Sequence, residues 1–188
     1  AFANCSLLTS VTMPGSLSVF ANSQYFSVGA SGRTIVYFTL FRDITPIDTV
    51  LSNAKVASQI GSATSINVVI DTSVITIGTT AFYSLLSLNS INIQNSVITI
   101  GTSAFGECVS ATSLTIGSSV SSILTYAFSQ CSSMQSIIIP GNVIHLDDFS
   151  FYKNVVATTL TINSGVKRIG QSAFEDCNSI TSIIIPIS

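Results

Sequence analysis

One 23-residue step recurs through most of the chain and constrains its fold more than any other feature. Five phenylalanines share one column of this repeat, at Phe82, Phe105, Phe128, Phe151 and Phe174. Valine, isoleucine or leucine fill further columns at the same step, and the unit reads L/I-x-I-x-x-x-V-x-x-I-G-x-x-A-F-x-x-C. A fixed step of this length predicts a solenoid, because one unit cannot bury its apolar side alone and has to stack on its neighbours.

The L/I-x-I element predicts one short strand in each repeat, since its apolar and variable residues alternate. Stacked repeats would place these strands side by side in a parallel sheet. The Val, Ile and Ala-Phe positions recur too sparsely for a long helix, so we expect irregular or short-helical return arms. The predicted fold is a single solenoid over residues 1–188 with about eight coils, the sheet on one face and the return arms on the other.

The middle of the N-terminal half departs from the repeat. Tyr25 and Phe82 are separated by more than two repeats but fewer than three. We therefore expect regular repeats over 1–25 and 66–188, and divergent repeats with an insertion over 26–65. Such an insertion is either a tolerated loop or part of a functional face.

A glycine column follows the isoleucine column of the repeat. Gly78, Gly101 and Gly170 suit a turn that needs a positive φ, yet Leu124 and Asp147 stand in the same column. We expect the backbone there to have a negative φ or to vary from coil to coil.

The segments "LTIGSSVSSILTYAFSQC", "SIIIPGNV" and "GVKRIGQSAFEDCNSITSIIIP" resemble the leucine-rich repeats of the BspA type, also called the treponemal class. The resemblance is strong over residues 66–188, good over 1–25 and weak between them. It implies a leucine-rich-repeat solenoid. It also implies a non-catalytic surface or secreted protein of the kind found in bacteria and some protists, implicated in adhesion to host proteins or other cells.

Low charge excludes several classes of partner. Only 7% of the residues are charged, the net charge is −2, and the six Lys and Arg residues are scattered. This disfavours nucleic acid and anionic lipid, which require basic patches. The apolar runs are about five residues long, too short for a transmembrane segment. The abundant Ser and Thr suit an extracellular or cell-surface location, with O-glycosylation as an option.

Four cysteines occupy one column, three residues after the repeat aromatic, at Cys5, Cys108, Cys131 and Cys177. Val28, Leu85 and Asn154 fill the same column elsewhere. This mixture indicates an inward packing position where cysteine acts as a small apolar residue, and we expect free thiols rather than disulfides. The CxxC-type clusters of zinc sites do not occur, so we expect no metal.

His145, the only histidine, lies beside Asp147 and Asp148 and is the one candidate general base. It precedes the apolar Leu146 at a position where other repeats carry Thr, Ser or Arg, which favours an exposed surface residue. General-base catalysis would also need a nucleophile and an oxyanion donor, and the sequence identifies neither. We therefore expect no catalytic residue, no cofactor and no enzyme activity.

The outward positions of the predicted strands form the candidate interaction face. They are small hydroxyl, amide or β-branched residues without charge or aromatic rings: Thr12, Asn92, Ser113, Thr115, Ser136, Ile138, Thr159, Thr161 and Ile184. Three interpretations remain open. The face is a solvated sheet surface, a flat surface that packs against a copy of itself or a glycan, or an ice-matching array whose Thr pairs the isoleucines interrupt.

The sequence as a whole predicts an extracellular adhesion, protein-interaction or surface-structure module. The first alternative is a self-assembling filament subunit, because the two ends stop out of phase without a polar cap and expose strand edges to end-to-end addition. An excerpt from a longer solenoid would have the same ends. Binding of glycan or ice through the Ser/Thr-rich strand face is a further alternative.

Overall fold

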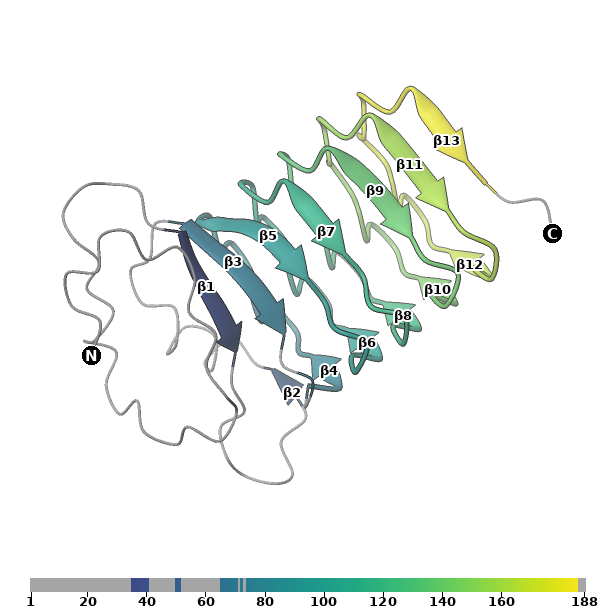
Figure 1. Cartoon of the computed structure of the whole chain (residues 1–188). Coiled ribbons are helices and arrows are strands. Elements are labelled where there is room, and N and C mark those ends of the chain that lie inside the picture. The colour runs from purple at the N-terminus through teal and green to yellow at the C-terminus, as the bar shows by residue number, and fades with distance from the viewer. Residues whose placement is uncertain (1–34, 41–49, 52–64, 71, 73, 186–188) are drawn as a thin grey trace, which may run out of the picture.

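The computed structural model describes residues 35–40, 50–51, 65–70, 72 and 74–185. These residues form a parallel β-solenoid with about five complete turns between residues 65 and 184, preceded by the strands of an earlier coil (Figure 1). Each turn contributes one longer strand to a first row and one two-residue strand to a second row. The first row contains β1 (Ile35–Leu40), β3 (Ser65–Ile70), β5 (Leu88–Asn92), β7 (Ser113–Thr115), β9 (Ser136–Ile139), β11 (Thr159–Ile162) and β13 (Ser182–Ile184). The second row contains β2 (Val50–Leu51), β4 (Thr76–Ile77), β6 (Thr99–Ile100), β8 (Ser122–Ile123), β10 (His145–Leu146) and β12 (Arg168–Ile169).

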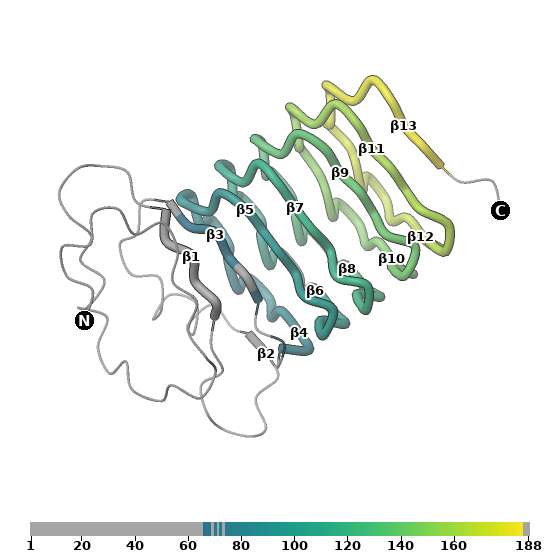
Figure 2. Tube along the Cα trace, viewed as in Figure 1, coloured from purple at the N-terminus to yellow at the C-terminus, as the bar shows by residue number. Residues whose placement is uncertain are grey.

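All strand pairs are parallel, and among the strands from β4 to β13 their register follows the repeat. Leu160 pairs with Ile137 and Ile183, each one repeat away. The first row consists of two sheets, β1-β3-β5-β7 and β9-β11-β13, which meet where β7 and β9 contact each other. The tube in Figure 2 shows the coils following one another at a regular interval along a single axis. The predicted solenoid with a short parallel sheet on one face is confirmed.

The return path differs from the expected one. It carries the second row of strands, which we did not predict, followed by a six-residue segment of consecutive turns. We call these segments the turn arms; they are residues 79–84, 102–107, 125–130, 148–153 and 171–176. No helix occurs among the described residues, so the short-helical alternative for the return arm does not hold there.

The hydrogen bonds of a turn arm explain why it is not helical. In one arm, the backbone N–H groups of Ser103, Phe105 and Glu107 donate to carbonyls of the following coil at 2.8–3.0 Å. The N–H groups of Ala104 and Gly106 donate three residues back within their own coil, at 3.1 Å. A helix would direct every N–H along its own segment. Here alternate donors join neighbouring coils, so the arm adds a third line of hydrogen bonds beside the two strand rows.

Each complete turn arm contains two residues with a positive φ, and neither is a glycine. The first of them stands at Thr80, Ser103, Tyr126, Phe149 and Ser172, and the second at Ser84, Glu107, Gln130, Lys153 and Asp176, with φ between 51° and 60°. The glycine column lies two residues earlier and does not share this conformation. Gly101 instead permits close approach, because a Cβ there would lie 2.7 Å from the carbonyl oxygen of Ile77.

The core consists of the columns that the repeat predicts. Val97, Ile100, Ala104 and Phe105 are fully buried, and their equivalents in the coils on either side are buried as well. The phenylalanine rings stack in one continuous line from Phe82 to Phe174, with centroids 4.7–5.5 Å apart. In the last described coil Ile169 and Ile183 are exposed, since no described coil covers them.

Several expectations concern residues that lie wholly or largely outside the described part of the chain. The total of about eight coils and the division into regular and divergent repeats stay predictions, because most of residues 1–64 lies outside the described part. The pairing of β1 with β3 joins Ile35 to Ser65, so the coil that begins at β1 is longer than one regular repeat. Cys5 and Thr12 also lie outside the described residues.

Replacing Ser150 with alanine should stabilise the protein. Ser150 stands in the alanine column, is fully buried, and its Oγ has no hydrogen-bond partner among the described residues. Removing a buried, unpaired hydroxyl should raise the free energy of unfolding by about 1 kcal/mol, measured by urea denaturation. A loss of stability in Ser150→Ala would contradict this account, because it would reveal a partner for the hydroxyl.

Candidate interaction surface

The predicted interaction residues on the described strands lie together on one side of the first strand row. We call this side the strand face; it comprises the outward side chains of β5, β7, β9, β11 and β13. Asn92 pairs with Thr115, Ile138 with Thr161, and Thr161 with Ile184, which makes one row along the solenoid. Ser113, Ser136 and Thr159 form a second row beside it, and Ser136 pairs with Thr159.

Most of the strand face is open to solvent. Ile138 and Ile184 are 55% and 58% exposed, Thr161 is half-buried, and the other predicted members of both rows are exposed. None of them is charged. The spacing between neighbouring coils follows the strand separation of about 4.8 Å, so each row repeats hydroxyl or methyl groups at that interval.

The strand face changes character at its N-terminal end. Asn67 is buried, and its side-chain oxygen accepts hydrogen bonds from the hydroxyl of Ser90 and from the amide of Asn89 at 3.2 Å. These side chains contact one another across β3 and β5 and are buried or half-buried. The more exposed part of the strand face lies over β7, β9, β11 and β13.

The cysteine column faces inward, as predicted. Cys108 and Cys131 are buried free thiols, and Cys177 is a half-buried one. Each donates its S–H to the carbonyl of the phenylalanine 26 positions earlier, at 3.1–3.2 Å. Asn154 replaces the thiol in one coil and donates to the carbonyl of Phe128 at 3.0 Å. The column thus supplies a hydrogen bond between coils, which the apolar interpretation of cysteine did not anticipate.

Burial also disfavours ionisation of the two buried thiols. It raises the pKa of Cys108 to about 12 and raises the pKa of Cys131 well above its ordinary value. The thiolate is the nucleophile and the metal ligand, and at neutral pH these groups remain protonated. Among residues 74–185, and in the rest of the described part, no group of three His, Cys, Asp or Glu residues is arranged to hold a metal ion.

His145 lies on the surface of β10, and the residue that follows it, Leu146, is fully buried. Its strand neighbours are Ser122 and Arg168. The Oδ1 of Asp148 accepts a hydrogen bond from the backbone N–H of Gln171 at 2.8 Å, so this carboxylate links two coils. The exposed position predicted for His145 is confirmed.

A cluster of aromatic side chains on the turn arms was not predicted. The rings of Tyr126 and Phe149 stack with centroids 4.9 Å apart, and Tyr152 meets Phe149 edge to face at 5.6 Å. The Nζ of Lys153 lies 5.1 Å from the ring centroid of Tyr152. The sequence did carry a signal: Tyr126 and Phe149 are one repeat apart, in a column that otherwise holds Thr and Ser.

The turn arms carry a second exposed tyrosine contact. The hydroxyl of Tyr83 donates to Oε1 of Glu107 in the next coil at 2.5 Å. That hydrogen bond is the largest cause of a raised pKa of Tyr83, and partial burial and the charge of Glu107 raise the pKa further. The ring lies close to Gly106, where an added Cβ would meet it at 3.1 Å, so this glycine gives the tyrosine room to cross to the neighbouring coil.

The family model for the BspA type leucine rich repeat region matches residues 60–188 with six copies of the repeat. The chain belongs to this family. No curated protein matches it in sequence. The match covers all of the described strands from β3 onward, and it agrees with the resemblance that the phenylalanine and cysteine columns indicate.

Solved structures of other leucine-rich repeat proteins are similar to this chain. A leucine-rich cell surface protein from Faecalibacterium prausnitzii is 29% identical with a TM-score of 0.62, over 67% of this chain and 33% of that one. A leucine-rich repeat protein of T. pallidum is 27% identical with a TM-score of 0.63, over 66% and 60%. One from Bacteroides ovatus is 30% identical with a TM-score of 0.55, over 60% and 29%. The chain therefore spans about a third of the first structure and less than two thirds of the second.

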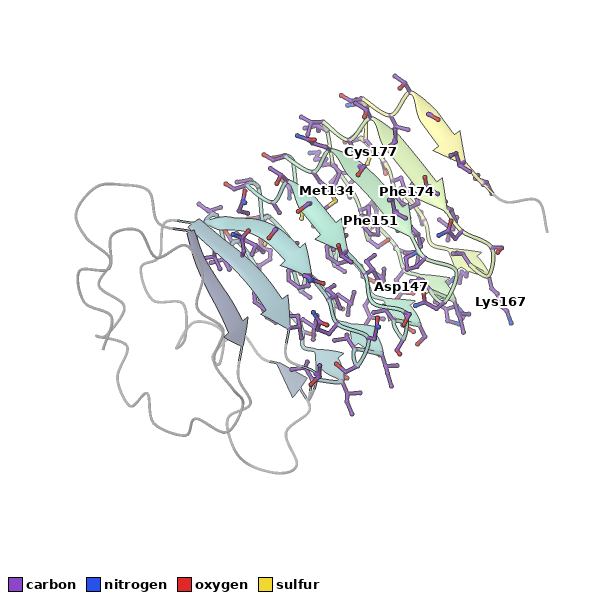
Figure 3. All side chains as sticks on the ribbon, in the orientation of Figure 1. Met134, Asp147, Phe151, Lys167, Phe174 and Cys177 are labelled. Atoms are coloured by element: carbon purple, nitrogen blue, oxygen red, sulfur yellow. The ribbon has the colours of Figure 1, made fainter. Side chains whose placement is uncertain are left out.

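The BspA-type repeat fixes the inward columns and leaves the outward ones free to vary. Figure 3 shows Phe151, Phe174, Met134 and Cys177 inside the solenoid, and Lys167 projecting from its outside near β12. Chemistry that differs from coil to coil lies on the outside, on the strand face and on the turn arms. Among the described residues, no helix is long and apolar enough to cross a membrane.

Proposed function

We propose that this chain is a non-catalytic, extracellular binding module whose strand face holds a partner protein. The observation that carries the proposal is the pair of aligned rows of exposed, uncharged side chains over β7, β9, β11 and β13. Charged residues are depleted at the centres of protein interfaces, and a surface without charges avoids the large cost of desolvating ions. The description of the Faecalibacterium relative as a cell surface protein supports the location.

A second copy of the chain is the alternative occupant of this face. Ile138 and Ile184 are large apolar residues that are more than half exposed, and both would gain from burial in a face-to-face contact. Filament growth by end-to-end stacking is the other form of self-association. A glycan would use the hydroxyls of Ser113, Ser136 and Thr159, and an ice surface would use the Thr pairs that the isoleucines interrupt.

The test compares Ile138→Arg with a matched variant, Ile98→Arg. Ile98 is also an exposed isoleucine, but it directly precedes β6 in the second strand row. Fluorescently labelled protein is applied to a panel of purified extracellular proteins and to a glycan array. A protein ligand should lose about tenfold or more in affinity with Ile138→Arg and keep its affinity with Ile98→Arg. Equal affinities for the two variants would place the binding surface elsewhere.

The same two variants separate the alternatives. Sedimentation across a concentration series detects self-association, and a species that dissociates only in Ile138→Arg would assign the strand face to a second copy. A hydroxyl-dependent hit on the glycan array would assign it to a carbohydrate. A thermal-hysteresis measurement tests the ice-matching alternative directly.

A further inference from the structure

The aromatic cluster on the turn arms has the properties of a second binding surface. We call Tyr126, Phe149 and Tyr152 the aromatic ledge. Tyr126 is 38% exposed, and Phe149 and Tyr152 are half-buried. The solenoid does not need these rings, because Thr80, Ser103 and Ser172 take the position of Tyr126 and Phe149 in other coils. Gly106, Ser129 and Glu175 take that of Tyr152, and only Tyr83 repeats the tyrosine among the described coils.

Two rings of the ledge occupy a costly backbone conformation. Tyr126 and Phe149 have φ values of 58° and 57°, in the left-handed region that disfavours bulky side chains. The small polar residues of the neighbouring coils adopt the same conformation in the same column. A bulky aromatic side chain at a strained backbone position, where the fold accepts serine, points to a role beyond packing.

Carboxylates accompany the ledge on its own turn arm and on the next one. Asp148 shares the arm of Phe149 and Tyr152, Glu175 and Asp176 lie on the following arm, and Lys153 is the only basic side chain on these two arms. Three carboxylates against one ammonium give these two arms a negative net charge. Lys167 and Arg168 lie on and next to β12, in the second strand row of the last described coil.

The ledge already binds one cation of its own chain. Lys153 Nζ lies 5.1 Å from the ring centroid of Tyr152, and the carboxylates of Asp176 and Glu175 are close enough to act on its charge. Cations are attracted to the faces of aromatic rings, and arginine is the residue that most often makes this contact because its planar guanidinium also stacks on rings. The combination of rings and carboxylates therefore suits a further cation.

We propose that the aromatic ledge and its carboxylates bind an arginine-containing basic segment of a partner protein. A neutral glycan is less well matched, because it gains nothing from the charge of the neighbouring carboxylates, whereas a cation does. This surface lies on the turn arms and not on the strands, so the inference goes beyond the strand-face proposal and does not depend on it.

The test uses a fluorescein-labelled peptide of four Arg-Gly repeats as the probe, with a Ser-Gly peptide of the same length as the blank. Binding is followed by fluorescence anisotropy at physiological ionic strength. Phe149→Ser installs the residue of two other coils without changing the charge, and it should weaken binding of the Arg-Gly peptide about fivefold. Tyr83→Ser, which removes an exposed tyrosine two coils before Tyr126 and outside the ledge, should leave the affinity unchanged.

Lys153→Gln provides a variant whose expected effect has the opposite sign. Gln130 stands in this column one coil earlier, so the turn arm accepts the side chain. Removing the Lys153 ammonium exposes the Tyr152 ring and leaves one more carboxylate charge uncompensated. The Arg-Gly peptide should therefore bind about two- to fivefold more tightly. Thermal denaturation of Phe149→Ser and Lys153→Gln shows whether partial unfolding contributes to either change in affinity.

Three results would overturn the inference. The first is a wild-type protein that binds the Arg-Gly peptide no better than the Ser-Gly peptide. The second is equal binding by wild type and Phe149→Ser, which would indicate general charge attraction. The third is a glycan that binds in a Phe149-dependent manner when the basic peptide does not. None of them bears on the strand face, which Ile138→Arg and Ile98→Arg test separately.

Discussion

Replacing Phe105 with alanine should lower the free energy of unfolding by about 3–5 kcal/mol. The ring is fully buried and stacks between Phe82 and Phe128, with centroids 4.7 Å and 5.2 Å away. The backbone beside it is hydrogen-bonded to the following coil, so the arm cannot collapse into the cavity that alanine would leave. Urea denaturation, monitored by circular dichroism, measures the effect.

Two variants serve as controls for Phe105→Ala. Ser113→Ala on the strand face should change stability by no more than about 0.5 kcal/mol, because its side chain is exposed. Phe174→Ala should cost less than Phe105→Ala, since Phe174 is only half-buried and its described ring contact is with Phe151 alone. If Phe105→Ala kept its stability but lost ligand binding, the phenylalanine column would be a functional motif and not a core.

Replacing Asn154 with alanine should destabilise the protein by about 2 kcal/mol. The Asn154 side chain is fully buried, and its amide donates to the carbonyl oxygens of Phe128 at 3.0 Å and Phe151 at 2.7 Å. Alanine removes both hydrogen bonds and leaves a cavity. The measurement is again urea denaturation: the midpoint should fall, while the dependence of the unfolding free energy on urea concentration stays unchanged.

Asn154→Cys is the informative companion. A thiol in this column donates to the same type of carbonyl in three other coils, as Cys131 does to Phe105. Cysteine would also remove the side-chain oxygen of Asn154, which has no partner among the described residues. We expect its stability to stay within about 1 kcal/mol of the wild type. A loss as large as that of Asn154→Ala would mean that the thiol column does not contribute a hydrogen bond between coils.

The inward half of the structure is predictable from the sequence, because burial imposes one residue type on each column. Val97, Ile100 and Phe105 recur in kind once per repeat, and all three are fully buried. The strands of the first row follow from the same pattern. Their register is also predictable, since parallel coils of equal length align residues one repeat apart.

The turn arms are not predictable in this way. Their shape depends on N–H groups such as those of Ser103 and Phe105, which donate to the following coil, and no local propensity encodes a hydrogen bond to a carbonyl so distant in sequence. The positive φ of Ser103 is equally hidden, because the glycine that usually indicates it stands two residues earlier for a steric reason. A two-residue strand such as β6 is likewise too short to leave a pattern.

The two candidate surfaces also differ in how far the sequence predicts them. The strand face is predictable because side chains alternate in a strand, so Thr115 and Ile138 follow from their neighbours Leu114 and Ile137. Predicting the aromatic ledge requires that outward residues one repeat apart are compared as well as inward ones. Tyr126 and Phe149 are variable residues within one coil, and only their stacking across two coils makes them a surface.

The uniform register between coils also determines which changes of length the molecule tolerates. Because the strand pairs from β6 onward join residues one repeat apart, deleting or duplicating one whole repeat joins a coil to an equivalent neighbour and preserves the kinds of contact between coils. Deleting a single residue within a coil shifts the columns that follow it, and apolar side chains would turn outward. Chains whose lengths differ by whole repeats therefore keep the same alignment of inward columns. Such a chain can gain or lose coils in evolution while its core residues stay the same.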